Sequence, residues 1–190
     1  MKTVSVMIVG VGGQGSLLAS KLLGRLLVDE GYDVKVSEVH GMSQRGGSVV
    51  TYVRFGDKVY SPIITDGEAD IIISFEKLEA GRYANYLKKD GKIVVNTQQI
   101  DPMPVIIGAA EYPENILDEL TAKGVSIDAL DALSLANEAG SSKAVNIVLM
   151  GKASKYFDIP YEKWITAIEN TVAPKFVEIN KKAFDLGYNS

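Results

Sequence analysis

The first thirty residues constrain the fold more than any other part of the chain. Residues 3–9 form the continuous apolar and β-branched run TVSVMIV, which is typical of a strand buried on both faces of a parallel sheet. Residues 16–30 carry leucines at helical spacing, and Gly31 stands where a helix C-cap is expected. A run of glycines separates the two. The pattern predicts a strand, a glycine loop and a helix, and a second strand over residues 33–37 completes a βαβ unit.

The remaining residues continue the alternation of strands and helices, with one antiparallel excursion. Residues 48–55 and 58–60 flank a Gly-Asp pair and predict a hairpin. Two buried parallel strands are expected over residues 70–75 and 92–96, with a helix over residues 76–89 between them. A short apolar piece at residues 105–107 lies among three prolines, before a predicted helix over residues 113–123 and a strand over residues 125–128.

Helices are expected over residues 144–157 and again from Pro160, with a break at Pro174. The fold class is therefore α/β: Rossmann-like, with a mostly parallel sheet, an antiparallel hairpin insertion and a helical C-terminal region. A length of 190 residues favours a single domain over residues 1–190.

Composition excludes several functions. A net charge of -4 without a long basic run argues against nucleic acid as a partner. The chain has no cysteine, which excludes a cysteine nucleophile, a disulfide framework and a thiolate-ligated iron–sulfur cluster within it. With one histidine in addition, a transition-metal site is not expected. No stretch approaches the ~20 apolar residues of a membrane span, and no secretory signal is evident, so we expect a soluble, cytoplasmic protein.

The glycine loop is the first candidate site. Gly10, Gly12, Gly13, Gln14 and Gly15 satisfy a G-x-G-x-x-G pattern between a predicted strand and a predicted helix. Glycines permit a close backbone approach, and the free N–H groups at a helix start attract anions. One hypothesis is a nicotinamide or flavin dinucleotide, with Glu38 accepting from the ribose. The other is that the glycines serve only a tight strand-to-helix turn.

The segment after the second strand is the second candidate site. A dinucleotide-binding domain is expected to have a short connection here, whereas residues 37–48 form a long loop with three glycines. Arg45 could clamp a phosphate or carboxylate, helped by backbone donors of the adjacent glycines. His40 could titrate near neutral pH, although a lone histidine is more often a structural hydrogen-bonding residue. The candidate substrate or partner residues are Glu38, His40, Ser43, Gln44, Arg45, Gly46 and Gly47.

The remaining sequence patterns give weaker evidence for a functional site. Glu76 and Glu79 could form a carboxylate pair, but acidic residues are also favoured for dipole reasons in an exposed first helical turn, which is the interpretation we prefer. Asp131 is a candidate helix N-cap. The sequence lacks a Walker loop, a Gly-x-Ser-x-Gly elbow and a plausible nucleophile triad, so no catalytic residue is assigned.

The two loops together resemble a known family. The string GVGGQG, followed by SEVHGMSQRGGSV at residues 37–49, is similar to the gamma-type domain of 2-oxoacid:ferredoxin oxidoreductases, and in particular to the indolepyruvate-type beta subunits. Further matches at residues 53–54, 61–62, 67–70, 76–80 and 146–148 extend the resemblance over nearly the whole chain.

The resemblance implies a two-subunit enzyme. A large alpha subunit would bind thiamine diphosphate with magnesium and carry the iron–sulfur clusters, and this chain would bind none of these cofactors alone. The implied reaction is the oxidative decarboxylation of an aryl pyruvate such as indolepyruvate, with coenzyme A as co-substrate, to an aryl-acetyl-CoA, with electrons passed to ferredoxin. The chain would be the non-cluster subunit, inactive alone. Two alternatives remain: an independent NAD- or FAD-dependent oxidoreductase, and a purely structural subunit.

Overall fold

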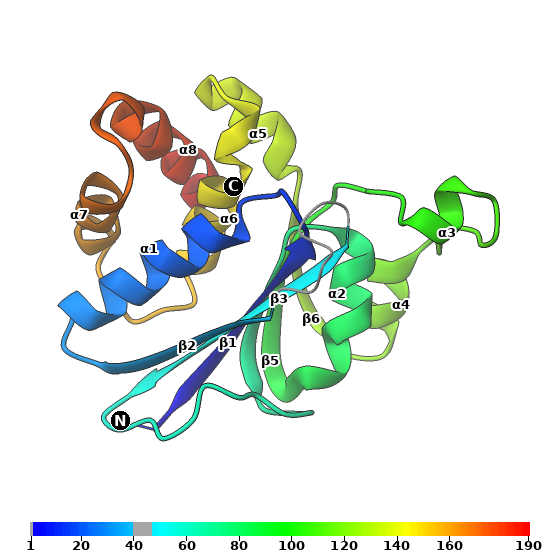
Figure 1. Ribbon diagram of the computed structural model, residues 1–190, viewed down its shortest axis with the longest axis horizontal. Helices are drawn as coiled ribbons and strands as arrows, with labels where there is room; N and C mark the ends of the chain where they lie inside the picture. The colour runs from blue at the N-terminus through cyan, green and yellow to red at the C-terminus, as the bar shows by residue number, and fades with distance from the viewer. Residues whose placement is uncertain (1, 40–46) are drawn as a thin grey trace.

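A single six-stranded mixed sheet forms the centre of the protein (Figure 1). The computed structural model describes residues 2–39 and 47–190, so the predictions for His40, Ser43, Gln44, Arg45 and Gly46 lie outside the described residues. The strands are β1 (Val4–Val11), β2 (Asp33–Val39), β3 (Ser48–Gly56), β4 (Ala69–Ser74), β5 (Leu87–Asn96) and β6 (Ser126–Leu130). They lie in the order β2-β3-β1-β4-β5-β6.

Helices and short 3-10 turns connect the strands and follow the last one. They are α1 (Ser16–Asp29), α2 (Lys77–Tyr83), η1 (Ala84–Tyr86), α3 (Met103–Ile106), α4 (Ile116–Ala122), α5 (Ala132–Ala139), η2 (Ser142–Ala144), α6 (Val145–Ser154), α7 (Tyr161–Thr171), η3 (Pro174–Phe176) and α8 (Val177–Asn189). The predicted strand, glycine loop and helix at the start of the chain are confirmed, as are the helix start after Pro160 and the break at Pro174.

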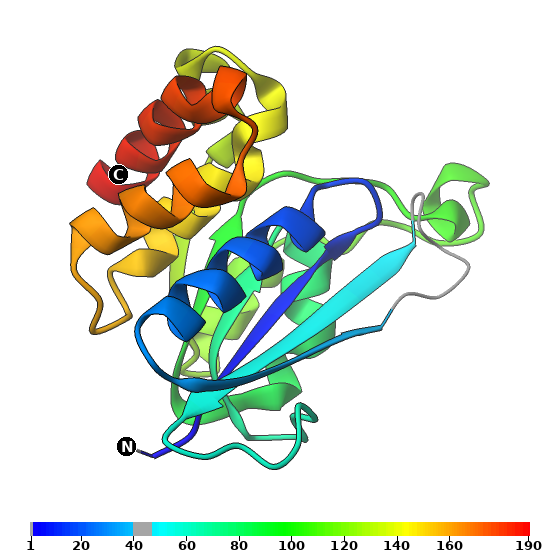
Figure 2. The same cartoon turned by 60° about the vertical axis from the view of Figure 1, so that its left-hand side comes forward.

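The two faces of the sheet are covered unequally. Helices α1 and α5 to α8 lie over one face, and α2 and α4 lie over the other (Figures 1 and 2). Alternate residues of β1 divide between the two cores, with Val6 and Ile8 in the larger and Met7 and Val9 in the smaller. The continuous apolar run of β1 is therefore explained by burial on both faces.

The antiparallel pair is present, but its members differ from those predicted. Strand β3 is antiparallel to both β2 and β1, and it lies between them. The prediction that residues 58–60 form the second hairpin strand is wrong, because this segment forms no strand. Val59 is instead buried, and its N–H donates to Asp33 Oδ2 at 2.8 Å. Strands β1 and β2 consequently do not neighbour each other as they do in a simple βαβ unit.

The predicted helix over residues 76–89 is also too long. Helix α2 ends at Tyr83, one 3-10 turn follows, and β5 already begins at Leu87. The register between β4 and β5 shifts between Ala69 and Ile71, where Ala69 pairs with Leu87 but Ile71 pairs with Lys92, so the pairing is irregular beside Gly91. A Cβ at Gly91 would lie 2.8 Å from the Leu87 side chain, so this irregular pairing depends on a glycine that helical spacing does not reveal.

Within residues 2–39 and 47–190, no helix combines the length and apolar character that a membrane crossing requires.

Candidate functional site

One edge of the sheet collects most of the candidate residues that the structure describes. The carboxyl ends of the parallel strands β1, β4, β5 and β6 meet there, together with the start of the antiparallel strand β3 (Figure 2). Open α/β sheets place their ligands at this edge, because loops and helix N-termini converge there. The glycine loop of residues 10–15 leaves β1 at its centre.

The side chain of Gln14 holds the glycine loop in place. Gln14 Oε1 accepts from the Val11 N–H at 2.8 Å, and Gln14 Nε2 donates to the Phe75 carbonyl oxygen at 3.0 Å. Asn96 Nδ2 donates to the same carbonyl at 3.1 Å, so one amide from β1's loop and one from β5 converge on the end of β4. The glutamine of the motif is therefore a structural brace within the loop.

The loop's backbone donors are only partly open. The Gly12 N–H donates to the Gly47 carbonyl oxygen at 2.8 Å, and the Gln14 N–H donates to that of Val11 at 3.2 Å. In the part of the chain that the structure describes, the N–H groups of Gly13, Gly15 and Ser16 make no hydrogen bond. Helix α1 also has no side-chain cap and no acidic residue in its first turn. An anion would therefore meet open donors and the positive end of a fourteen-residue helix.

A cavity of about 500 Å³ opens directly onto these donors. Its lining residues are Gly13, Gln14, Gly15, Gln98, Leu133, Ser142, Lys143 and Val145. Lys143 brings a positive charge to the cavity from the start of the C-terminal helices. No local pattern around Lys143 marks it as a site residue, because it lies more than a hundred positions from the glycine loop in sequence.

Gly15 and Gly13 are required for different reasons. Both have positive φ, 87° and 102° respectively. A Cβ at Gly15 would lie 2.8 Å from Asn146 Nδ2, whereas a Cβ at Gly13 would meet nothing within 4 Å. Asn146 Nδ2 also donates to the Gly15 carbonyl oxygen at 3.2 Å. Gly15 thus docks the loop against α6, while Gly13 leaves open space at the cavity.

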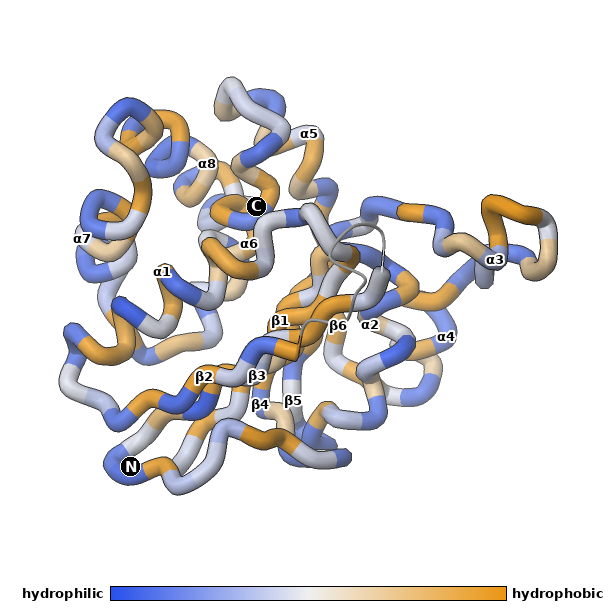
Figure 3. The backbone as a smooth tube through the Cα atoms, in the orientation of Figure 1, coloured by the Kyte–Doolittle hydropathy of each residue, from blue (hydrophilic) through white to orange (hydrophobic). Residues whose placement is uncertain are grey.

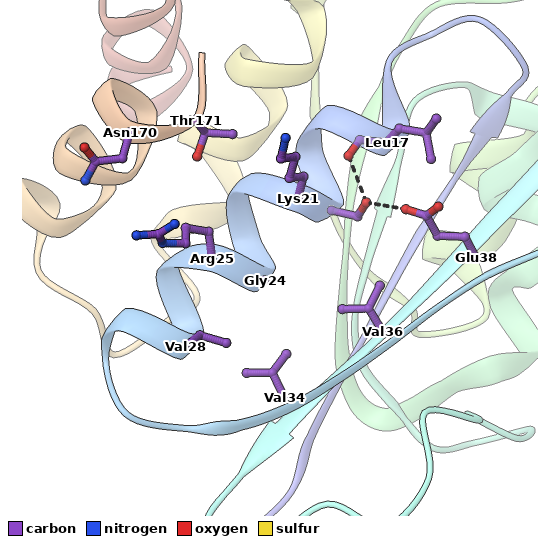
Figure 4. Close-up of a pocket in the computed structure, with 11 residues that line it drawn as sticks. Leu17, Lys21, Gly24, Arg25, Val28, Val34, Val36, Glu38, Asn170 and Thr171 are labelled. Carbon is purple, nitrogen blue, oxygen red and sulfur yellow. Dashed lines mark hydrogen bonds between the residues drawn. The ribbon is translucent and has the colours of Figure 1, made fainter. Parts of the chain in front are cut away.

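Glu38 lies apart from the glycine loop. Its carboxylate accepts from the Ser20 hydroxyl of α1 at 3.0 Å and lines a groove of about 740 Å³ between α1, β2 and α7 (Figure 4). A dinucleotide's ribose requires an acidic residue at the end of a strand adjacent to β1. Strand β3 occupies that place, with Val49 opposite Gly10, so Glu38 and the glycine loop do not fit a dinucleotide.

Glu76 lies at the end of β4 and is buried, 1% exposed. One of its oxygens caps α2 by accepting from the Glu79 N–H at 3.1 Å. The other accepts from the Ile100 N–H at 3.1 Å and from the Tyr112 hydroxyl. Burial, and then the bond to Glu76, raise the pKa of the Tyr112 hydroxyl. The expectation of an exposed first helical turn is wrong here, because segments far along the chain cover it.

Glu79 is buried as well, at 4% exposed, and it lies beside the start of β3. Its carboxylate accepts from the Ser48 hydroxyl and pairs with Arg82 Nε at 3.3 Å. Burial raises the pKa of the Glu79 carboxyl, against the lowering effect of Ser48 and Arg82. With Gly47, Ser48 and Pro104, these residues line a cavity of about 210 Å³. Helical spacing marked Glu79 as one of a possible carboxylate pair, but it did not reveal the burial of Glu79, because that burial arises from tertiary contacts.

No group of three or more histidine, cysteine, aspartate or glutamate side chains lies close enough to hold an ion within residues 2–39 and 47–190. An iron–sulfur cluster requires thiolates, and the sequence contains no cysteine.

The predicted helix cap is confirmed. Asp131 caps α5 by accepting from the Ser134 N–H at 3.0 Å.

The fold and the site together define a Rossmann-like α/β protein whose glycine loop presents open backbone donors at the carboxyl edge of its sheet. The chain belongs to the pyruvate ferredoxin/flavodoxin oxidoreductase family, whose sequence model matches residues 5–190. It is 46% identical over 194 residues to the indolepyruvate oxidoreductase subunit IorB of Thermococcus kodakarensis, covering 98% of this chain and 95% of that relative. The resemblance read from the two loops is confirmed.

Solved structures show the same fold at low identity. The pyruvate oxidoreductase subunit PORC of Thermotoga maritima superposes with a TM-score of 0.76 at 20% identity, covering 100% of this chain and 97% of that one. A 2-oxoglutarate:ferredoxin oxidoreductase of Magnetococcus marinus, solved with 2-oxoglutarate, coenzyme A and succinyl-CoA, matches with a TM-score of 0.75 at 19% identity. That match covers 100% of this chain and 31% of the larger one. The family match and the 46% identity to an IorB subunit make the chain homologous to subunits of 2-oxoacid:ferredoxin oxidoreductases, and these structures show that the fold is shared.

Proposed function

We propose that residues 1–190 form a single gamma-type domain that serves as the non-cluster subunit of an indolepyruvate-type 2-oxoacid:ferredoxin oxidoreductase. The alpha subunit of the complex binds thiamine diphosphate and magnesium and carries the iron–sulfur clusters. The complex oxidatively decarboxylates an aryl pyruvate to an aryl-acetyl-CoA and passes the electrons to ferredoxin. This chain is inactive alone, and we place the complex in the cytoplasm, in keeping with the absence of cysteine.

The kinship to an indolepyruvate oxidoreductase subunit at 46% identity over nearly both full lengths is the observation that carries the proposal. The composition supports the assignment of the iron–sulfur clusters to another subunit, because a chain without cysteine cannot ligate clusters that transfer electrons.

Coenzyme A is the anion we assign to the glycine-loop edge. In this proposal the open N–H groups of Gly13 and Gly15 and the charge of Lys143 receive one phosphate-bearing part of the molecule. Arg45 of the second loop supplies a further charge. Gly12 and Gln14 act indirectly, since their own N–H groups hold the loop in shape.

Co-expression with the cluster-bearing subunit tests the proposal. Size exclusion should yield a brown complex, and a dye-coupled assay with indolepyruvate and coenzyme A should show activity only when both chains are present. The independent-enzyme alternative predicts the opposite: no complex, no added activity, and tight nicotinamide or flavin binding by the isolated chain.

Single substitutions separate a coenzyme A site from a purely structural subunit. Arg45→Ala should raise the KM for coenzyme A in the assembled complex by an amount that corresponds to about 1.5–3 kcal/mol of lost charge-assisted bonding. Lys143→Ala should raise the same KM by a smaller factor, with Lys21→Ala as the matched control on the exposed face of α1. If Arg45→Ala and Lys143→Ala change only the assembly of the complex and leave the KM for coenzyme A unaltered, this edge contacts the partner subunit and does not bind coenzyme A.

A further inference from the structure

Residues 100–112, here called the arm, project from the sheet edge between β5 and α4 (Figure 1). The arm is folded within itself around one helical turn, α3. The Ile106 N–H donates to the Pro102 carbonyl oxygen at 3.1 Å, and the Ala109 and Ala110 N–H groups donate to that of Pro104 at 2.8 and 3.1 Å. The turn at residues 102–110 is therefore closed by hydrogen bonds of its own backbone.

The tip of the arm is apolar and exposed. Met103, Ile106 and Ile107 are 64%, 65% and 68% exposed, and Figure 3 shows this region as an apolar segment standing away from the two cores. Single exposed apolar side chains are common on soluble proteins, whereas three large ones on one ordered projection indicate a contact surface.

A buried carboxylate fixes both stems of the arm. Glu76 Oε1 accepts from the Ile100 N–H of the incoming stem at 3.1 Å and from the Tyr112 hydroxyl of the outgoing stem. The Tyr112 hydroxyl in turn accepts from the Leu78 N–H at 3.1 Å, and Lys77 Nζ lies 5.6 Å from the centre of its ring. The arm is thus held in place before any partner arrives, which lowers the entropy cost of binding.

Within the arm and the helix that follows it, charge has one sign. The cations beside the arm belong to α2, where Lys77 lies over the Tyr112 ring and Arg82 pairs with Glu79. Residues 93–122 contain no lysine or arginine, and their acidic residues are Asp101, Glu111, Glu114, Asp118 and Glu119. Asp101, Glu111 and Glu114 are exposed at and near the base of the arm. A complementary surface therefore has an apolar floor for the tip and a cationic rim for the base.

We propose that the arm docks into an apolar socket with a cationic rim on the cluster-bearing subunit, an inference that rests on the proposed function. Charge complementarity and a continuous surface both support the cluster-bearing subunit as the partner of the arm. Pro102, Met103 and Pro104 line the same small cavity as Gly47 and Ser48, so a partner that covers the glycine-loop edge also meets the arm. The tip supplies apolar contact area, and the acidic base sets the orientation.

The double variant Ile106→Asp/Ile107→Asp tests the arm in the co-expressed complex. We expect at least about a 100-fold rise in the Kd for the cluster-bearing subunit, because two central apolar anchors become charged. Circular dichroism and the melting temperature of the isolated chain should stay unchanged, since the tip contacts neither core. The matched control is Tyr60→Asp/Ile63→Asp, which changes two apolar residues that are 88% and 49% exposed in the segment after β3, at the opposite end of the sheet, and it should leave the Kd unaltered.

Hydrogen–deuterium exchange of the wild-type complex gives an independent readout. We expect peptides that cover residues 101–111 to gain protection on assembly. Unchanged affinity of the arm variant, with no gain in protection, overturns the arm inference while the proposed function stands. A wild-type chain that never assembles with the cluster-bearing subunit removes both. Self-association of the isolated chain that the arm variant abolishes, with the heteromeric Kd unchanged, assigns the arm to a second copy and also overturns the inference.

Discussion

The glycine loop and the arm leave the same sheet edge and are built in the same way, yet they present opposite chemistry. Gln14 braces the first and Glu76 braces the second, each with a buried or half-buried polar side chain that satisfies backbone groups on both sides. The loop ends in open N–H donors beside a lysine, whereas the arm ends in exposed methionine and isoleucine. The difference indicates that one sheet edge can present two separate, pre-ordered surfaces, one suited to a small anion and one suited to a protein partner.

The largest effect is expected for the brace of the arm. Glu76→Ala should lower the free energy of unfolding by about 3 kcal/mol, because three donors, one buried and two part-buried, lose their acceptor together. Urea denaturation measures this. Asp131→Ala is the control, since it removes an exposed N-cap and should cost only about 1 kcal/mol. Equal losses for the two variants would contradict a special role for Glu76.

Loss of the Gln14 brace in the glycine loop should lower the free energy of unfolding by somewhat less. Gln14→Leu should cost about 2 kcal/mol, because the Val11 N–H and the Phe75 carbonyl oxygen each lose a partner. Gln99→Leu at an exposed position should be close to neutral in the same denaturation experiment. A neutral Gln14→Leu variant would mean that the loop keeps its shape without the amide.

Two glycine substitutions test the separate roles of Gly15, which packs against α6, and Gly13, which leaves space at the cavity. Gly13→Ala should cost about 1 kcal/mol, the penalty for a Cβ at positive φ in open space. Gly15→Ala should cost about 2 kcal/mol, since the added Cβ also meets Asn146. Thermal denaturation of both variants tests the order, and Gly15→Ala/Asn146→Ala should recover part of the difference.

The smallest effect is a pH dependence at the point where the two regions meet. Burial raises the pKa of the Glu79 carboxyl above its ordinary value of 4.5. The folded state therefore keeps this proton to a higher pH than the unfolded chain does. Stability contributed by Glu79 is present below pH 4.5 and is lost as pH rises through the folded pKa.

Comparison of the wild type with Glu79→Gln isolates this contribution. The difference in free energy of unfolding, wild type minus variant, should fall between pH 4.5 and neutrality. A difference that rises over this interval would show that Ser48 and Arg82 outweigh burial.

Local chemistry made much of the fold predictable. The βαβ alternation, the glycine loop, the Asp131 cap and the effects of Pro160 and Pro174 depend on residues within a few positions of one another. The helix predicted over residues 76–89 failed because a strand pairing at Leu87 overrides the local preference. Lys143 and the burial of Glu79 escaped prediction because their neighbours lie far away in the sequence.

By itself, the sequence determined the fold class, the family and the two glycine-rich segments, since strand and helix periodicity and glycine's conformational freedom are local properties of the chain. Only the tertiary structure decided that β3 lies between β1 and β2, which separates Glu38 from the glycine loop. It also decided that Glu76 is buried beneath Tyr112 and braces an exposed apolar arm. Strand order and burial follow from contacts between distant segments, whose energies no single stretch of sequence contains.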